Sequence, residues 1–294
     1  MTNPMLLKIK RLAFKRWDIF QICNMIFLVV LSLFMLLPIV FIMNHAFKPI
    51  NELFLYPPRF FVENPTFFHF KQLFLRTQTL IVPFSRYFFN SLVSTGFAVL
   101  GIIVFSVAAA YAFSKQHFPG KQLFFSFIIT SLMFAPETVG IPRYMVIAKL
   151  GIMNTYFVHI LPLIAAPVGV FLLKQFIDQV PNELLEAAKI DGAKDWVIIL
   201  RIIVPVCLPA IATVGILAFQ STWSQTETSA LYTQTESMKT LPYYAMTLTN
   251  GVANNIVGQG MAAVAGLMIF MPNLIIFLLF QRKILATMAH SGIK

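Results

Sequence analysis

The chain has 294 residues, of which 58% are hydrophobic and only 11% are charged, and its mean hydropathy is +0.78. Because soluble domains carry about 25% charged residues, these values exclude a disordered chain, a small disulfide-stapled secreted domain and most soluble enzymes. The formal net charge is +11, but the basic residues lie scattered between apolar runs, so nucleic acid is not expected as a partner. The composition predicts a protein that lies in a membrane and contacts lipid.

Six apolar runs are long enough to cross the hydrocarbon core of a bilayer, which takes about 20 residues of helix. Each run is continuous, without alternation of polar and apolar residues, and this favours helices over the strands of a barrel. We therefore expect an all-α integral membrane protein with six transmembrane helices. In chain order the runs cover residues 19–43, 88–113, 123–147, 156–175, 202–223 and 258–280.

Lys and Arg are distributed unequally between the two sides that these helices define. The N-terminal segment, the segments after the second and fourth runs and the C-terminal tail hold more of them than the segments on the other side. By the positive-inside rule, both termini are expected in the cytoplasm. On the external side, residues 44–86 are expected to form an ordered cap. The polar residues 224–257 are expected to form a solvated connector or, alternatively, a contact for a partner or solute.

Prolines in the last four runs predict kinked helices, since proline removes a backbone hydrogen bond. Ordinary packing between the helices is the alternative explanation. These prolines are Pro136, Pro142, Pro162, Pro167, Pro205, Pro209 and Pro272.

A short amphipathic helix is predicted at the start of residues 181–200, between the fourth and fifth runs. Asn182 can cap its first turn, and Glu183 and Glu186 suit the positive end of the helix dipole. Gly192 is expected to end the helix, because glycine adopts a positive φ without a steric penalty. A second helix then leads into the fifth run. The face shared by apolar residues is expected to hold Leu184, Leu185 and Ala188.

The residues of this segment resemble the EAA motif of permease subunits of binding-protein-dependent ABC importers. The family pattern is Glu-Ala-Ala, two residues, Asp-Gly-Ala, and then a hydrophobic stretch that ends in two prolines four residues apart. The chain matches this pattern with Glu186-Ala187-Ala188, Asp191-Gly192-Ala193, Pro205 and Pro209.

Other stretches resemble the carbohydrate-uptake branch of that family, the maltose-type inner-membrane permeases. Two of them are Ile141-Pro142-Arg143-Tyr144 and Thr240-Leu241-Pro242. The chain departs from the branch at Trp223-Ser224-Gln225, where the family often has Trp-Asn. The resemblance therefore points to sugars as a class and to no particular sugar.

The resemblance implies a permease subunit without enzymatic activity, which forms half of the pathway for a sugar or oligosaccharide in the bacterial cytoplasmic membrane. Residues 1–87 would hold the first helix and the external loop, and residues 88–294 a core of five helices. The implied partners are a second, homologous permease, an extracellular or periplasmic solute-binding protein and two ATPase subunits. The ATPases would use ATP and Mg, whereas this chain, which has no glycine-rich phosphate loop, would bind no cofactor or metal. The residues implied to couple transport to an ATPase are Glu186, Ala187, Ala188, Asp191, Gly192 and Ala193.

Four residues are candidates for the wall of the pathway. Glu137 is the only acid inside an expected span, where an acid is costly unless it faces water, a partner or a pathway. The alternative for Glu137 is a structural hydrogen bond to backbone freed by Pro136. Trp223, with Gln220 and Gln225 nearby, could contact a sugar, or it could belong to the aromatic belt at the membrane surface.

Two other classes of membrane protein are disfavoured by the sequence. A membrane-embedded enzyme needs converging His, Cys, Ser or carboxylate groups, whereas the five histidines are dispersed along the chain. An ion-coupled secondary transporter needs more acids inside the membrane than Glu137 alone. An importer permease for a solute other than a sugar stays open as the nearer alternative.

Overall fold

The computed structural model describes residues 19–291 except residues 54, 56, 58, 80, 81, 136 and 253–255. All secondary structure in this part of the chain is helical, as expected. Three helical segments are long and apolar enough to cross a membrane alone, and the number rises to five if each of two bent pairs of helices counts as one span. The three are α2 (Ile19–Phe47), α5 (Phe84–Lys115) and the stretch Gln259–Gln281 of α16 (Ile256–Ser291). The basic residues of the N-terminal segment lie outside the described residues.

The third apolar run, over residues 123–147, is broken near the position where Pro136 and Gly140 suggest a break, so it is not one continuous helix. Helix α6 (Lys121–Ser131) ends early, and α7 (Gly140–Lys149) begins after a turn. Within the turn the hydroxyl of Thr138 donates to the carbonyl of Ala135 over 2.7 Å. Ala135 precedes a proline, and the residue before a proline disfavours the helical conformation, which explains the break. Pro136 itself lies outside the described residues.

The fourth and fifth runs are bent at positions that the prolines predict. A 3₁₀ turn, η1 (Tyr156–His159), and α8 (Leu161–Ile164) meet α9 (Pro167–Asp178) at 42°. Helices α11 (Asp195–Ile198) and α12 (Val204–Val206) are joined by a π-helical turn over Ile199–Ile203. Together they meet the stretch Leu208–Leu231, which begins with α13 (Leu208–Trp223), at 86°. The helices α8, α9 and α13 each have a proline in the first turn, where its missing N–H costs nothing. Residues 202–206 therefore lie across the bundle axis, contrary to the expected span over 202–223.

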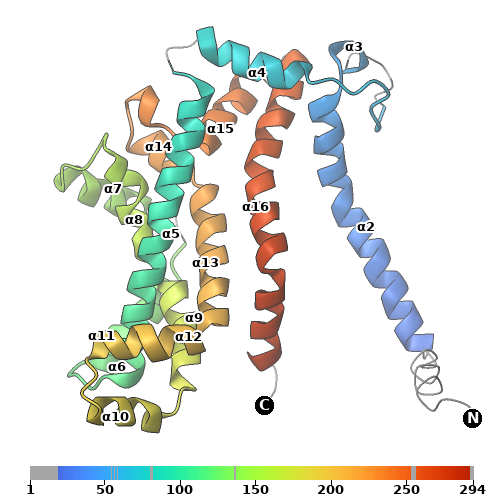
Figure 1. Ribbon diagram of the computed structural model, residues 1–294. Helices are drawn as coiled ribbons and strands as arrows, with labels where there is room; N and C mark the ends of the chain where they lie inside the picture. The colour runs from blue at the N-terminus through green and yellow to red at the C-terminus, as the bar shows by residue number, and fades with distance from the viewer. Residues whose placement is uncertain are drawn as a thin grey trace, which may run out of the picture.

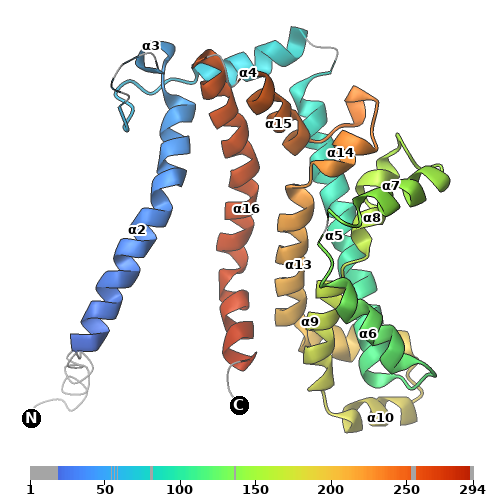
Figure 2. The ribbon, with the colours of Figure 1, turned by 180° about the vertical axis from the view of Figure 1, so that it is seen from behind.

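Four of the helices form the centre of the bundle. Figures 1 and 2 show α5, α9, α13 and α16 running roughly along one direction, with α2 leaning away from α16 towards the end that carries α10 (Asn182–Ile190). We call this the lower end and the opposite one the upper end. Helix α2 begins, and α16 ends, on the same side of the bundle as α10 (Figure 1). The larger apolar core joins α5, α9, α13 and the segment before α13 through Ile102, Val107, Leu173, Ile177, Ile203 and Val214.

The upper end is covered by short helices from the two long segments that were expected on the external side (Figure 1). The ordered cap expected over 44–86 includes α3 (Ile50–Leu53) and α4 (Phe68–Thr79). The carboxylate of Glu52 is buried there and accepts the backbone N–H groups of Glu63 (3.2 Å) and Asn64 (3.0 Å). Residues 224–257 were expected to be a solvated connector, but they fold into α14 (Glu227–Leu231), η3 (Glu236–Met238) and α15 (Leu241–Val252), with Tyr232 and Leu241 buried. Burial of these apolar side chains packs the segment against the rest of the bundle.

Helix α4 is fixed to α16 by a close approach at one glycine. A Cβ atom added at Gly260 would lie 2.4 Å from the ring of His69. The imidazole is fully buried, and its burial lowers the pKa of His69. Only glycine leaves room for this ring against the backbone of α16.

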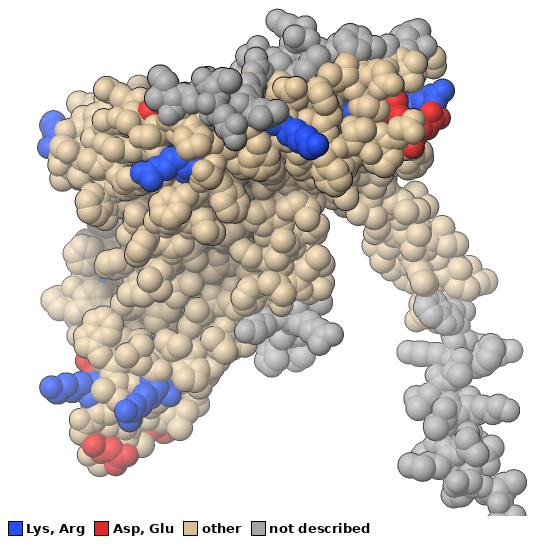
Figure 3. Space-filling model, turned by 45° about the horizontal axis from the view of Figure 1, so that its top comes forward, with Lys and Arg blue, Asp and Glu red and all other residues tan. Residues whose placement is uncertain are grey.

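Charged side chains are concentrated near the two ends of the molecule. Most of the surface between them in Figure 3 carries neither acids nor bases. This distribution matches a bundle whose middle contacts the hydrocarbon of a bilayer.

Candidate functional site

The short helix expected in segment 181–200 is α10, at the lower end of the bundle (Figure 1). Its first turn holds Glu183, as expected. Asn182 does not cap it. Pro181 occupies the cap position without a side-chain hydrogen bond, and the amide oxygen of Asn182 instead accepts a hydrogen bond from the ammonium of Lys115 over 2.9 Å. The long lysine from α5 reaches this oxygen and withdraws it from the helix terminus.

Gly192 ends α10 with the backbone geometry that the sequence predicts. Its φ is +81°. The N–H of Gly192 donates to the carbonyl of Lys189 over 3.0 Å, and that of Ala193 to the carbonyl of Ala188 over 2.9 Å. These two bonds form a Schellman motif, which satisfies carbonyls that the helix end leaves free. The turn directs the chain away from α10 and into α11.

The side chains of α10 divide into an inner and an outer set. Leu185 is buried in the apolar core, and Ala188 and Ala193 pack against that core. Leu184 was expected on the same face, but it is exposed. Among the motif residues, Glu186, Ala187, Asp191 and Gly192 are exposed.

The exposed side of the segment carries large apolar side chains. Ile190 is 86% exposed and Trp196 is 64% exposed. Ile190 is the last residue of α10 and Trp196 lies in α11, on the two sides of the turn at Gly192. Exposed apolar side chains of this size are typical of a contact surface for another protein. The acids of the motif lie beside them and add charge to the same surface.

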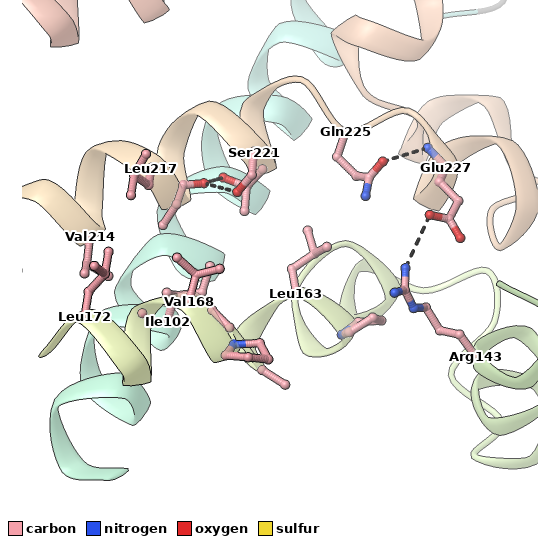
Figure 4. A pocket seen from close by; sticks show the side chains of 17 residues that line it. Ile102, Arg143, Leu163, Val168, Leu172, Val214, Leu217, Ser221, Gln225 and Glu227 are labelled. Atoms are coloured by element: carbon pink, nitrogen blue, oxygen red, sulfur yellow. Dashed lines mark hydrogen bonds and ion pairs between the residues drawn. The ribbon is translucent and has the colours of Figure 1, made fainter. Parts of the chain in front are cut away.

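A cavity of about 490 Å³ lies between α8, α9 and α13. Figure 4 shows Leu163, Val168 and Leu172 on one wall and Val214 and Leu217 on the other. Most of the lining is apolar, and polar groups lie towards one end. The cavity adjoins the break between α8 and α9, which the prolines of the fourth run produce.

An ion pair closes the polar end of this cavity. The guanidinium of Arg143, from α7, lies 3.3 Å from the carboxylate of Glu227, from α14 (Figure 4). The other carboxylate oxygen of Glu227 accepts the hydroxyl of Tyr232 over 2.9 Å. Burial and this acidic neighbour raise the pKa of Tyr232 to about 12, so its proton stays on the hydroxyl at neutral pH. The amide oxygen of Gln225 accepts the backbone N–H of Glu227 over 3.2 Å.

Of the four expected pathway residues, the structure places one in the cavity wall. Gln225 lines the polar end, whereas Gln220 is exposed and lies outside the lining. Glu137 is exposed in the turn between α6 and α7, also outside the lining.

Trp223 has neither of its two expected environments. Its side chain is 1% exposed, and its indole N–H donates to the carbonyl of Ile269 in α16 over 3.0 Å. The ring stacks on Phe219, with 5.5 Å between the ring centroids. Trp223 therefore packs α13 against α16 and offers no free face to a sugar in this conformation.

Sequence reasoning did not identify Arg143 and Glu227 as a pair. Arg143 stands in one of the stretches that carry the family resemblance, but nothing in the sequence connects it with a residue 84 positions away. Among the described residues, no three His, Cys, Asp or Glu side chains come together in a way that could hold a metal ion.

The chain resembles known proteins over most of its length. Residues 15–284 match the family described as "Binding-protein-dependent transport system inner membrane component". The chain is 31% identical over 208 residues to the arabinooligosaccharides transport system permease protein AraQ of Halalkalibacterium halodurans, covering 71% of this chain and 74% of the relative. It is 30% identical over 210 residues to the melibiose/raffinose/stachyose import permease protein MelC of Bacillus subtilis, covering 70% and 75%.

A solved structure shares the fold. It is the crystal structure of a bacterial ABC transporter involved in the import of the acidic polysaccharide alginate, with a TM-score of 0.76 and 22% identity. The alignment covers 92% of this chain and 98% of that chain.

Proposed function

We propose that this chain forms half of the translocation pathway of an ATP-driven importer, because it belongs to the family of binding-protein-dependent transport system inner membrane components. A second, homologous permease would form the other half. A solute-binding protein would deliver the solute from outside, as the family description implies. The chain itself would do no chemistry.

We propose a sugar or oligosaccharide as the solute. The names of the two relatives specify arabinooligosaccharides and the melibiose, raffinose and stachyose group, and both relatives match about 70% of this chain. An importer permease for a non-sugar solute is the alternative, and an ion-coupled secondary transporter is a more distant one. Transport that continues without any ATPase would favour the latter.

The observation that carries the coupling role is the exposed apolar surface of α10 and α11 around Gly192. The side chains of Ile190 and Trp196 lie in water unless a partner covers them, and exposed apolar groups of this size favour association. In the proposed importer this surface docks onto one of two ATPase subunits, which bind ATP and Mg. Closure of the ATPase pair would pull on α10 and move the helices that line the pathway.

We propose that the chain crosses the bacterial cytoplasmic membrane six times, with α6 and α7 together as a broken third span. The lower end, with α10 and both termini, would face the cytoplasm. Lipid or the second permease would cover α2, whose most apolar stretch has no buried residue within this chain.

The cavity at the break between α8 and α9 is the best candidate for a pathway segment inside this subunit. Gln225 and the pair of Arg143 and Glu227 would offer hydrogen bonds at its polar end. We retain Gln220 and Glu137 as candidates only for other conformations, since both lie outside this cavity here. Trp223 would have to leave the core to join them.

Cross-linking of α10 tests the proposal. A cysteine at Ile190, in a background without the native cysteines, should form a disulfide with a cysteine in the cleft of the ATPase in the assembled complex. A cysteine at Phe61, which is also exposed but lies at the upper end, is the matched control and should form none. Absence of the Ile190 cross-link in an assembly that hydrolyses ATP and imports raffinose or arabinotriose would contradict the coupling role.

A further inference from the structure

Two side chains near the end of α5, one helical turn apart, contact the two ends of residues 180–195, which we call the coupling segment. The ammonium of Lys115 donates to the carbonyl of Val180 over 2.6 Å and to the side chain of Asn182 over 2.9 Å. One helical turn earlier, the hydroxyl of Tyr111 donates to the carboxylate of Asp195 over 3.0 Å. Residues four apart on a helix lie on the same face, so α5 presents one surface to both ends of the segment.

Tyr111 is the buried partner in these contacts, whereas its acceptor Asp195 is exposed and also lies 4.0 Å from the ammonium of Lys189. Tyr111 is 3% exposed and belongs to the same apolar core as Leu185 of α10 and Ile198 of α11. The core holds the middle of the segment by apolar contact, and the two polar side chains hold its ends. Each of these hydrogen bonds has a charged donor or acceptor, and such bonds are stronger than neutral ones.

Ser114, which lies between Tyr111 and Lys115 in α5, directs its side-chain hydrogen bond to α9 and not to the coupling segment. The hydroxyl of Ser114 donates to the carboxylate of Asp178, the last residue of α9, over 2.6 Å. Like the bond from Tyr111, this bond has a carboxylate as its acceptor, and Ser114 directly precedes Lys115 in α5. Its acceptor Asp178, however, lies outside the coupling segment. Ser114 is therefore a matched control.

The upper end of α5 is bonded in a similar way to the external segment. The side-chain amide of Asn90 donates to the carbonyls of Ser237 (2.8 Å) and Lys239 (2.9 Å). The backbone N–H of Leu241 donates to the hydroxyl of Ser91 over 2.7 Å. Helix α5 has 32 residues, which corresponds to a rod of about 48 Å. One helix thus links the coupling segment with residues 237–241.

We propose that Tyr111 and Lys115 are positioning residues that fix the coupling segment to α5, so that a displacement of α10 reaches the external residues 237–241 through this helix. The inference rests on the proposed function, because it assumes that an ATPase moves α10. It adds the residues within this chain that carry the movement onwards.

The test uses the assembled importer in proteoliposomes, with MgATP and vanadate as the only probes. A cysteine at Ser237, in a background without native cysteines, reports on the external segment through its rate of reaction with an impermeant thiol reagent. We expect nucleotide to change this rate in the parent protein. In Tyr111→Phe and in Lys115→Met the change should fall by about tenfold, the factor equivalent to the loss of one hydrogen bond to a charged group. Ser114→Ala should keep it.

Conservative variants separate positioning from general stability. Lys115→Arg retains a cation and donors, and Asp195→Asn retains an acceptor for Tyr111, so both should keep the nucleotide-dependent change. Asp195→Ala should behave like Tyr111→Phe, and the double variant should be no worse than either, since both remove the same bond.

Three outcomes would overturn the inference. These are a nucleotide response in Tyr111→Phe and Lys115→Met equal to the parent's, an equal loss in Ser114→Ala, and no response in the parent. The cross-link from Ile190 to the ATPase, measured in the same preparations, identifies which idea has failed. If the cross-link forms in every variant, only the inference is wrong, whereas its absence in the parent contradicts the proposed function.

Discussion

Replacement of Gly192 by valine tests the turn that ends α10. Gly192 has a φ of +81°, and a Cβ atom added there would meet no other atom within 4 Å. The substitution therefore causes no steric overlap with other residues, and its whole cost is backbone strain. A non-glycine residue in the left-handed region costs roughly 1–2 kcal/mol, and β-branching adds to this. That cost lowers the population of the observed turn relative to other conformations by about 5-fold to 30-fold.

The spanning helices do not depend on this turn, so Gly192→Val should still be found in the membrane in normal amounts. Uptake of the transported sugar should fall, and the ATPase should dissociate or stop responding to the loaded binding protein. Gly192→Asn should lose much less, because asparagine tolerates a positive φ. Glu186→Lys should give a milder defect than valine at Gly192, since it reverses one exposed charge on the contact surface and leaves the turn intact.

Gly140 provides the control for bulk alone. It also has open space around its Cβ position, but it begins α7 without a positive φ. Gly140→Val should therefore transport at close to the parent rate. If Gly192→Val is expressed normally and transports as fast as Gly140→Val, the turn has no part in coupling and the reasoning is wrong.

Three further predictions concern topology and packing. A cysteine at Ser237 should react with an impermeant thiol reagent from outside intact cells and one at Lys194 should not; the reverse pattern would invert the proposed orientation. Gly260→Ala should destabilise the packing of α4 on α16 by about 1–3 kcal/mol, because it displaces the fully buried ring of His69. Thermal unfolding in detergent measures this, and the additional change His69→Ala should restore part of the loss. If Gly260→Ala has no effect, the ring of His69 is not packed tightly against the backbone of α16. Trp223→Phe should lower stability by about 1 kcal/mol through loss of the indole hydrogen bond and leave sugar specificity unchanged; a changed specificity would return this residue to the pathway.

The sequence alone determined the membrane class, the all-helical fold and the place of the short helix α10 with its end at Gly192. Each of these depends on local chemistry. A continuous apolar run has few alternatives to a helix in lipid, because the backbone must satisfy its own hydrogen bonds there. The end of α10 at Gly192 is also predictable from local chemistry, because the ability to adopt a positive φ is a property of glycine itself and not of its distant neighbours.

The prolines predicted where helices would break, but not how far each would bend. Similar pairs of prolines accompany a bend of 42° at α9 and one of 86° at α13. A proline removes a hydrogen bond and leaves the angle to be set by the helices packed around the break. The break between α6 and α7 follows the same rule, since Pro136 and Gly140 indicated a break there and not the turn that joins the two helices.

The tertiary structure alone decided which polar and aromatic residues face the cavity. Trp223 and Gln225 lie two residues apart, yet one is packed against α16 and the other lines the cavity. Arg143 and Glu227 form an ion pair only because α7 and α14 both reach the polar end of the cavity. Pairings of this kind depend on how separate helices are placed relative to one another. Residue types and spacing along the chain do not encode that placement locally, so the coupling segment could be read from the sequence and the cavity could not.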